Sequence, residues 1–227
     1  MGLQEKMQRV NRHWAAVDDR SLPERRLLLL QGVNQEAFEQ LMERLPLRRM
    51  EFVRREWKVK LARARYVRRK EELHEWLWLI KACTRAGMSG TSWPRLLPRL
   101  PGLGQSFQYW LDTGLMALAT WESMLEDSPP NEGNWPFTTP DGRTVKMFAQ
   151  FMAAFELAFW AVRRREIRAG LARNRLGREQ EKATALLMAY GHGVRGWLGT
   201  KDRLSRNIPK LWPAKKKRRR KIRRKAA

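Results

Sequence analysis

The amino-acid sequence predicts an all-α fold, and three observations support this prediction. Apolar residues recur at helical spacing along the 227-residue chain, whereas no run alternates convincingly between apolar and polar residues. Residues that typically begin or end helices separate these stretches. Two successive stretches also place apolar side chains at heptad spacing, which predicts two long helices that pack along one seam each.

The first hundred residues contain several helix-end signals. Ser21 to Glu24 reads SLPE, which is typical of a capping box and predicts a short helix ending at Gly32. Asn34 is placed to cap a second helix that ends near Pro46. Residues 47–86 are rich in helix formers and contain neither Gly nor Pro. The connector that follows should be irregular, because it contains Gly87, Gly90, Pro94, Pro98 and Pro101.

The two heptad stretches predict a helical hairpin at about residues 105–176. The first seam contains Phe107, Leu111, Gly114, Leu118, Trp121 and Leu125. The second seam contains Val145, Phe148, Met152, Phe155, Phe159 and Val162, and its helix should run to about Leu176. The turn-rich segment between the two seams predicts a helix–turn–helix hairpin.

One seam per helix leaves other apolar side chains of this hairpin uncovered. These are Trp110, Leu115, Met116, Phe151 and Trp160. Two hairpins from two chains could cover them by pairing into a four-helix bundle. The N-terminal helices of the same chain could also cover them. The pattern by itself favours neither arrangement.

The residues after the hairpin predict one more helix and an arm. Residues 179–190 should be helical, and four glycines between Gly191 and Gly199 should then interrupt the helix. Arg206 to Pro213 reads RNIPKLWP, an extended arm too short to form a core. We expect this arm to lie on its own body or on a neighbouring subunit.

The chain is strongly basic and ends in a dense run of cations. Its 47 Lys and Arg against 23 Asp and Glu give a net charge of +24, and removing the ten cations of the run leaves +14 (24 − 10). Such a run stays extended until a polyanion neutralises it, which predicts nucleic-acid binding or nuclear import. The ten cations are Lys215, Lys216, Lys217, Arg218, Arg219, Arg220, Lys221, Arg223, Arg224 and Lys225.

The sequence contains none of the common catalytic or metal-binding motifs, including the P-loop, the GxSxG elbow and the HExxH pair. His13, His74 and His192 lie far apart, and the lone Cys83 leaves only an optional intermolecular disulfide. We therefore predict no catalytic residue, no cofactor, no metal and no enzyme activity. The start of the chain lacks a secretory signal, and residues 147–162 are too short to span a bilayer, so we predict no membrane insertion.

Several segments resemble one family in a shared order. Residues 114–129, GLMALATWESMLEDSP, resemble the ascending spike helix and tip of the hepatitis B virus capsid (core) protein, which has a near-identical LATW and LEDP run. Residues 176–191, LGREQEKATALLMAYG, resemble the GRE turn and apolar helix that follow in that family. Trp197, the Asn207 to Pro209 segment and the basic tail continue the same order. The resemblance covers about residues 107–225.

This resemblance to hepadnavirus core proteins implies an all-helical capsid subunit. Its paired hairpins would form a four-helix-bundle spike, additional helices would surround the base of the spike, and homodimers would assemble into an icosahedral shell. The implied dimer interface contains Phe107, Trp110, Leu111, Leu118, Trp121, Phe148, Met152, Phe155 and Phe159. The implied contacts between dimers are Tyr190, Trp197, Leu204, Ile208 and Trp212, where Leu204 stands near an arm tyrosine of the family.

The implied partners follow from the same resemblance. Residues 1–213 would form the assembly domain, with a C-terminal helix and arm at 178–213, and a disordered tail at 214–227 would package viral RNA or DNA. The protein would occur in the virion and in host cytoplasm, and import factors could carry it to the nucleus. The alternative from another class is a nuclear or ribosome-associated helical nucleic-acid-binding protein that never forms shells.

The first hundred residues resemble the family poorly and leave two readings open. Either residues 47–86 supply the family's next helices, followed by an insertion at about 87–104, or residues 71–86 do so and the first 70 residues are an extension. The long N-terminal region favours a distant relative, such as one from a fish hepadnavirus or nackednavirus.

Overall fold

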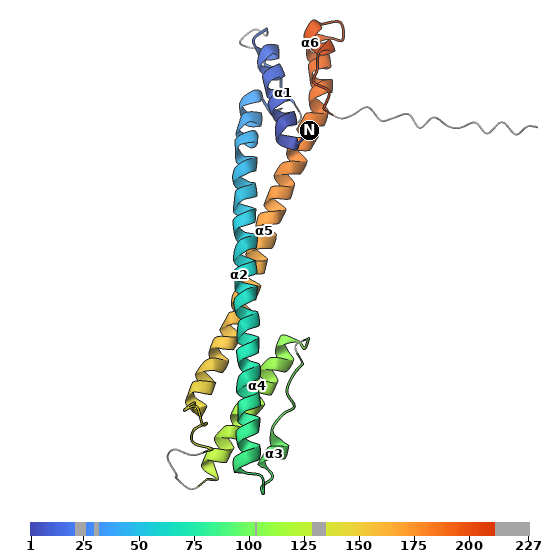
Figure 1. Ribbon diagram of the computed structural model, residues 1–227. Helices are drawn as coiled ribbons and strands as arrows, with labels where there is room; N and C mark the ends of the chain where they lie inside the picture. The colour runs from blue at the N-terminus through green and yellow to red at the C-terminus, as the bar shows by residue number, and fades with distance from the viewer. Residues whose placement is uncertain (21–25, 30–31, 103, 129–134, 212–227) are drawn as a thin grey trace, which may run out of the picture. The chain divides into compact units, whose positions relative to one another are not determined.

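The computed structural model describes residues 1–20, 26–29, 32–102, 104–128 and 135–211, and these residues confirm the all-α prediction (Figure 1). The only β feature among them is an isolated bridge between Leu29 and Val33. The helices are α1 (Leu3–Asp18), α2 (Gln35–Gly87), α3 (Trp93–Leu96), α4 (Phe107–Glu126), α5 (Val145–Leu198) and α6 (Arg203–Arg206).

The chain divides into two compact units. Met1–Glu51 and Arg173–Ala227 form the first, called here the terminal unit, and Phe52–Ala172 form the second, called here the hairpin unit. Helices α2 and α5 contribute residues to both units. The predicted hairpin therefore lies in the hairpin unit up to Ala172, whereas its last few residues and the predicted C-terminal helix and arm belong to the terminal unit.

Two predicted helix ends are wrong, because α2 and α5 continue through them. Pro46 lies inside α2, and Gly177 lies inside α5. Proline in a helix interior and glycine in a helix both cost free energy, about 3 and about 1 kcal/mol respectively. Burial of one face of each helix offsets these costs, as Leu41 and Leu45 are buried before the proline and Leu176 before the glycine. The predicted break at Gly191 is absent for the same reason, since Tyr190 and Val194 flank it in the core.

The predicted short helix from Ser21 to Gly32 is also not found in its described part. Ser21 and Glu24 lie outside the described residues. Residues 26–29 are not helical, and the backbone N–H of Leu29 instead donates to the carbonyl of Val33 at 2.8 Å. Asn34 does act as predicted, because its side-chain oxygen accepts from the backbone N–H of Ala37 at 2.9 Å.

The core of the hairpin unit forms where the two heptad seams meet. The Phe107 ring stacks on Phe159 with centroids 3.6 Å apart, while Trp121 near the other end of α4 meets Phe148 near the start of α5. The two helices are therefore antiparallel, as the hairpin prediction requires. The end of the Met152 side chain lies against Gly114, in the space that a Cβ atom there would fill.

Helix α2 packs against one face of this hairpin, called here the inward face. Its core residues Leu73, Trp76, Leu77 and Ile80 are buried against both seams. The Trp76 ring lies 5.2 Å from Phe148, and Tyr66 lies 5.6 Å from Phe155 (centroid distances). The same chain therefore covers the inward face, which was one of the two arrangements that the sequence left open.

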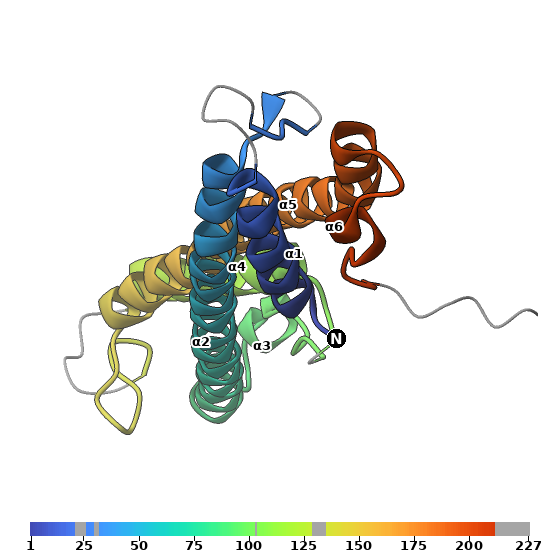
Figure 2. The same ribbon diagram turned by 90° about the horizontal axis from the view of Figure 1, so that it is seen from above.

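The terminal unit has its own core around α1. Helix α1 lies beside the start of α2 and the end of α5 (Figures 1 and 2). The Trp14 ring lies 5.6 Å from Phe38 of α2 and 5.2 Å from Tyr190 of α5, and all three side chains are fully buried. These contacts explain why the end of α5 remains helical despite its glycines.

Candidate assembly and nucleic-acid interfaces

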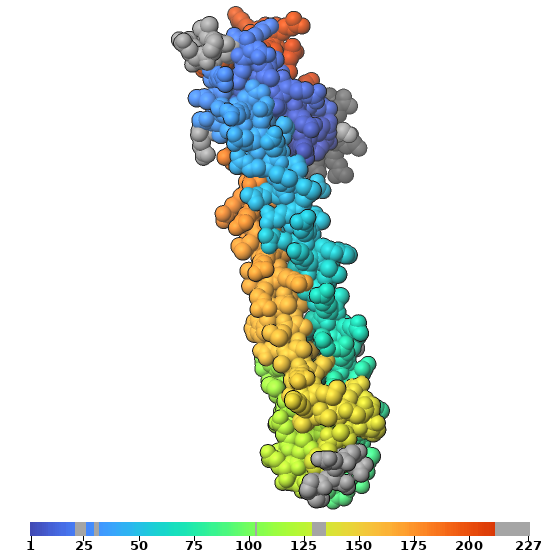
Figure 3. All heavy atoms as spheres, turned by 90° about the vertical axis from the view of Figure 1, so that its left-hand side faces the viewer, coloured from blue at the N-terminus to red at the C-terminus, as the bar shows by residue number. Residues whose placement is uncertain are grey.

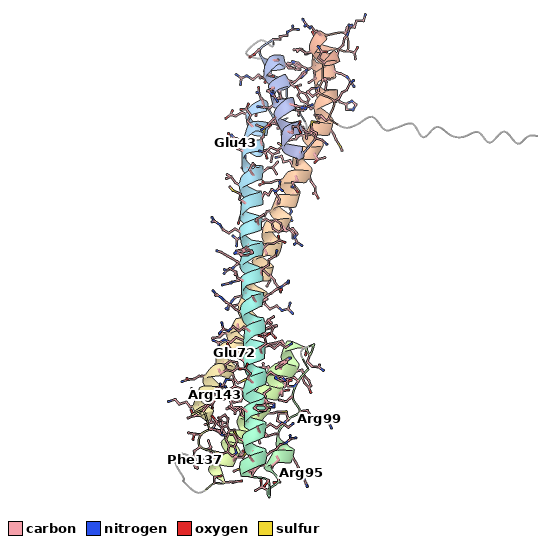
Figure 4. The ribbon with its side chains drawn as sticks, viewed as in Figure 1. Glu43, Glu72, Arg95, Arg99, Phe137 and Arg143 are labelled. Atoms are coloured by element: carbon pink, nitrogen blue, oxygen red, sulfur yellow. The ribbon has the colours of Figure 1, made fainter. Side chains whose placement is uncertain are left out.

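Trp121 fixes the segment that follows the hairpin tip. Its Nε1 donates to the carbonyl of Pro136 at 2.7 Å, and its ring stacks on Trp135 with centroids 5.0 Å apart. Arg143, just before α5, lies over the Trp76 ring at 4.8 Å and pairs with Asp141 at 2.8 Å (Figure 4). Arg143 and three tryptophans, Trp76, Trp121 and Trp135, thus join the returning segment to α4 and α2.

The predicted dimer-interface residues fall into two groups. Trp110, Trp121, Phe148, Met152 and Phe155 are buried within the hairpin unit. Phe107, Leu111, Leu118 and Phe159 are half-buried. Since α2 already covers the first group, their burial needs no second chain, and their assignment to an interface between chains is corrected to the core of the subunit. The second group keeps part of its surface exposed in the single chain, and its contact with a second chain stays a prediction.

Other apolar side chains of α4 and α5 are left uncovered. Leu115 and Met116 of α4 are 47% and 56% exposed, and four residues of α5 are 48–65% exposed: Leu157, Trp160, Ile167 and Leu171. Leu157, Trp160, Ile167 and Leu171 stand at heptad positions outside the first seam of α5, and the heptad position between Trp160 and Ile167 is occupied by Arg164. The sequence prediction included Leu115, Met116 and Trp160 but missed the others, although this second spacing could have revealed them. We call these six residues the outer face.

The predicted contacts between dimers lie in the terminal unit. Tyr190 is fully buried in its core, so its assignment to a contact with a neighbour is corrected to a core position. Leu204 and Ile208 are half-buried, whereas Trp197 is exposed. Trp212 lies outside the described residues. The described part of the arm lies on its own α5, because Leu211 is buried and Ile208 lies 3.8 Å from where a Cβ on Gly191 would stand.

His13 joins this arm to α1 and α5. Its Nε2 lies 3.1 Å from the carbonyl oxygen of Leu204, and its Nδ1 lies 2.9 Å from the Tyr190 hydroxyl. A carbonyl only accepts, so Nε2 carries the proton, and Nδ1 accepts from the Tyr190 hydroxyl. Burial, with a smaller contribution from the charge of Asp18, raises the pKa of Tyr190 and keeps that hydroxyl protonated.

We expect the terminal unit to lose stability in mild acid through His13. Burial lowers its pKa from 6.5, an effect only partly offset by the hydrogen bond to Leu204. The unfolded chain therefore binds the proton first as the pH falls below about 6.5, and the folded state is disfavoured from there down to the folded pKa. Thermal unfolding between about pH 7.5 and pH 5 should show this loss, and the His13→Gln variant should show less of it. His192→Gln, at an exposed histidine, is the control, and an equal pH dependence in all three proteins would contradict the assignment.

A basic region also lies within the hairpin unit, on α2 and α5. Residues 52–70 contain nine Lys and Arg but only Glu56 as an acid, and residues 163–168 of α5 contain four Arg and Glu166. Glu166 is already occupied, because it pairs with Arg63 at 2.6 Å and Arg163 at 3.4 Å, which lowers its pKa. The sequence prediction placed nucleic-acid contacts only in the tail. The net charge of +14 on the rest of the chain was the signal that could have revealed this basic region. The ten tail cations, Lys215 to Lys225, lie outside the described residues.

Groups that could support metal or redox chemistry are scarce in the described part of the chain. No three His, Cys, Asp or Glu side chains come together there as metal ligands. Cys83 is buried, and burial raises the pKa of its thiol, with a smaller contribution from the charge of Asp141. Both effects disfavour the optional intermolecular disulfide. That the chain is no enzyme stays a prediction.

Helix α5 also includes a stretch that is apolar enough to cross a membrane by length and composition. Its mean hydropathy is 1.4, and 28% of it is buried. One such helix is weak evidence for a membrane span, so the absence of membrane insertion stays a prediction. No protein-family model matches the chain, and no curated protein or solved structure is significantly similar to it.

Proposed function

We propose that this chain is the subunit of a viral capsid of the hepadnavirus core type, which assembles from homodimers and packages nucleic acid with its basic tail. The observation that carries the proposal is the outer face. A helical unit with a well-packed core leaves the six large apolar side chains of the outer face uncovered, in addition to Tyr109 and Met147 of the hairpin, in a chain with a run of ten cations. An uncovered apolar surface of this kind marks an interaction site.

A second copy of the chain is the partner that fits this face best. Helix α4 contains no Lys or Arg, so two hairpins can approach along Leu115 and Met116 without repulsion between cations, whereas the α5 part of the outer face also contains Arg164. Helix α2 in the same unit presents nine cations in residues 52–70, which disfavours pairing there. A bilayer fits less well, because Glu156 lies in this stretch of α5 and accepts a hydrogen bond from Nε1 of Trp160 at 3.1 Å. Two paired hairpins would form the four-helix bundle expected from the sequence.

The tail supplies a sequence-independent affinity for nucleic acid. Each cation that neutralises a phosphate releases a counterion, so binding should weaken steeply with salt. Residues 213–227 contain no Ser or Thr, so phosphorylation within them cannot change the charge. Every subunit of a shell contributes its own ten cations. The summed positive charge of the tails is therefore large enough to neutralise and package a genome-length polyanion.

Electron microscopy of the purified chain tests the proposal. We expect regular closed particles from the full chain, with an absorbance ratio at 260 and 280 nm that indicates bound RNA. A chain truncated after Pro213 should still form particles, because the outer face is unchanged, but should lose most of the RNA at physiological salt. Particles that keep their full RNA content after truncation would refute the role of the tail. Absence of particles from the full chain would refute the capsid function.

The alternative function, a nuclear or ribosome-associated nucleic-acid-binding protein, draws on the basic region of α2 and α5. Thirteen cations against two acids in residues 52–70 and 163–168 suit a polyanion whether or not shells form. The two functions differ in assembly. A protein of the alternative class stays monomeric or dimeric at every concentration, and the same micrographs distinguish them.

A further inference from the structure

We infer that the hairpin unit contains a second nucleic-acid-binding site, separate from the tail, in a groove between α2 and α5. The groove has a volume of about 490 Å³ and lies within the hairpin unit. We call it the basic groove. Its charged lining residues are Arg65, Arg68, Arg69 and Glu72 of α2 and Arg165 of α5. The ligand class is the sugar–phosphate backbone of a nucleic-acid strand.

Small side chains keep the basic groove open. Ala62 of α2 and Ala154, Ala158 and Ala161 of α5 line it between the arginines, together with Leu157, which also belongs to the outer face. The two helices lie side by side on the face shown in Figure 3. From Ala62 to Glu72 the groove extends about 15 Å along α2, at 1.5 Å per residue. One strand of a duplex places about four phosphates over that length, at about 3.4 Å each.

The arginines of the groove are largely available to a ligand. Four arginines and one glutamate give it a charge of 4 − 1 = +3. Arg65 has no acidic partner among the described residues, and the Arg68 side chain is 81% exposed. Arg68 and Arg69 share Glu72, at 3.2 and 2.8 Å, so that glutamate neutralises one of them at most. Arg165 donates from one Nη only, to the carbonyl of Lys58 at 3.1 Å.

The surroundings of the groove extend the positive charge along α2. Arg54, Lys58 and Lys60 precede it and are exposed, and none of them pairs with an acidic side chain in the described part of the chain. Trp57 lies among these cations and is 60% exposed, which provides a flat surface on which a base can stack. Cations interleaved with an exposed aromatic are typical of single-stranded nucleic-acid binding.

Charge complementarity favours nucleic acid over the other candidate occupants. A second copy of the chain would bring the same cations opposite one another. An anionic membrane surface would need a large apolar face at the groove, but the exposed apolar residues Val53, Trp57 and Leu61 of α2 do not line the groove, which is lined mainly by alanines between its arginines. A polyanion with regularly spaced phosphates can bind here through the cations and the open groove alone. This site does not depend on shell formation, so its failure and the failure of the capsid proposal would be observed separately.

The test uses the full-length chain with the ten tail cations replaced by glutamine, so that only the helical part binds. Fluorescence anisotropy with a labelled single-stranded RNA should still show binding at low salt. Adding Arg65→Gln, Arg68→Gln and Arg165→Gln should weaken binding at least tenfold. The slope of log K against log salt should fall by about 2, at about 0.7 per phosphate contact. Arg69 is kept so that Glu72 retains a partner.

A matched control removes three exposed arginines elsewhere: Arg12→Gln, Arg175→Gln and Arg195→Gln. Circular dichroism of both variants shows whether the helices are intact. The inference would be overturned if the control lost as much RNA affinity as the groove variant. The affinity would then depend on the net charge of the chain and not on the location of the arginines. Absence of RNA binding by the tail-neutral chain would overturn it as well. The inference would also be overturned if the groove substitutions abolished binding to anionic vesicles but left RNA binding unchanged.

Discussion

Replacing Trp121 by alanine should destabilise the hairpin unit by about 3–5 kcal/mol, the usual cost of deleting a buried tryptophan from a core. Trp121 is fully buried and stacks on Trp135, with Trp76 and Phe148 near its other edges. The substitution also leaves the carbonyl of Pro136 without its 2.7 Å hydrogen bond. It therefore combines a large cavity with a lost polar contact, which places it at the upper end of single-residue effects.

Urea unfolding followed by circular dichroism measures this effect. The matched control is Trp78→Ala, because Trp78 lies on α2 in the same unit and is exposed. We expect the control to change the free energy of unfolding by less than about 1 kcal/mol. Equal destabilisation by the two substitutions would mean that Trp121 is not in a packed core, and the described arrangement of α4 against α2 would then be wrong.

Placing glutamates on the outer face should abolish dimer formation. The double variant Leu115→Glu and Trp160→Glu puts one charge on α4 and one on α5, at positions that are 47% and 48% exposed in the single chain. Both sites are exposed, so the monomer should keep its fold. In a symmetric pair of hairpins each substituted position occurs once in each chain, so the four-helix bundle would bury two copies of each glutamate. Burial of an unpaired charge costs several kcal/mol per ion. The dissociation constant of the dimer should rise by at least a hundredfold.

Light scattering coupled to size-exclusion chromatography measures the mass of each variant. The control is Leu61→Glu with Trp78→Glu, which changes the same residue types on the exposed side of α2, where the side chains are 43% and 59% exposed. We expect a monomer from the outer-face variant and a dimer from the control. A dimer in both cases would place the interface elsewhere, and a monomer in the unchanged chain would remove the basis of the capsid proposal.

The sequence predicted the hairpin well because the evidence for it is local. The seam from Phe107 to Leu125 lies within α4, and α5 begins at Val145, the first residue of the second seam. Heptad spacing depends only on residues a few positions apart along one helix. It can therefore be recognised in the sequence without knowledge of the tertiary structure. The same reasoning failed at Pro46 and Gly177, where local signals for a helix end were overridden by burial of neighbouring side chains.

The candidate sites were predicted less completely, because they depend on contacts between distant residues. Trp110 and Phe148 carry the same apolar signal whether α2 or a second chain covers them, and only the packing of Trp76 identifies α2 as the cover. The basic groove requires Arg65 and Arg165, a hundred positions apart, to line one space. No spacing rule relates such residues.

The sequence by itself therefore determined the all-α class, the two long helices of the hairpin, the net charge of +24 and the ten-cation tail. These properties are sums over residues or local periodicities, which do not change with the way the helices pack. The tertiary structure decided that α2 covers the inward face of the hairpin, that Tyr190 belongs to the core of the terminal unit, and that the outer face and the basic groove remain open. Burial is a property of contacts between segments far apart in the chain, so it becomes known only when those segments are placed together.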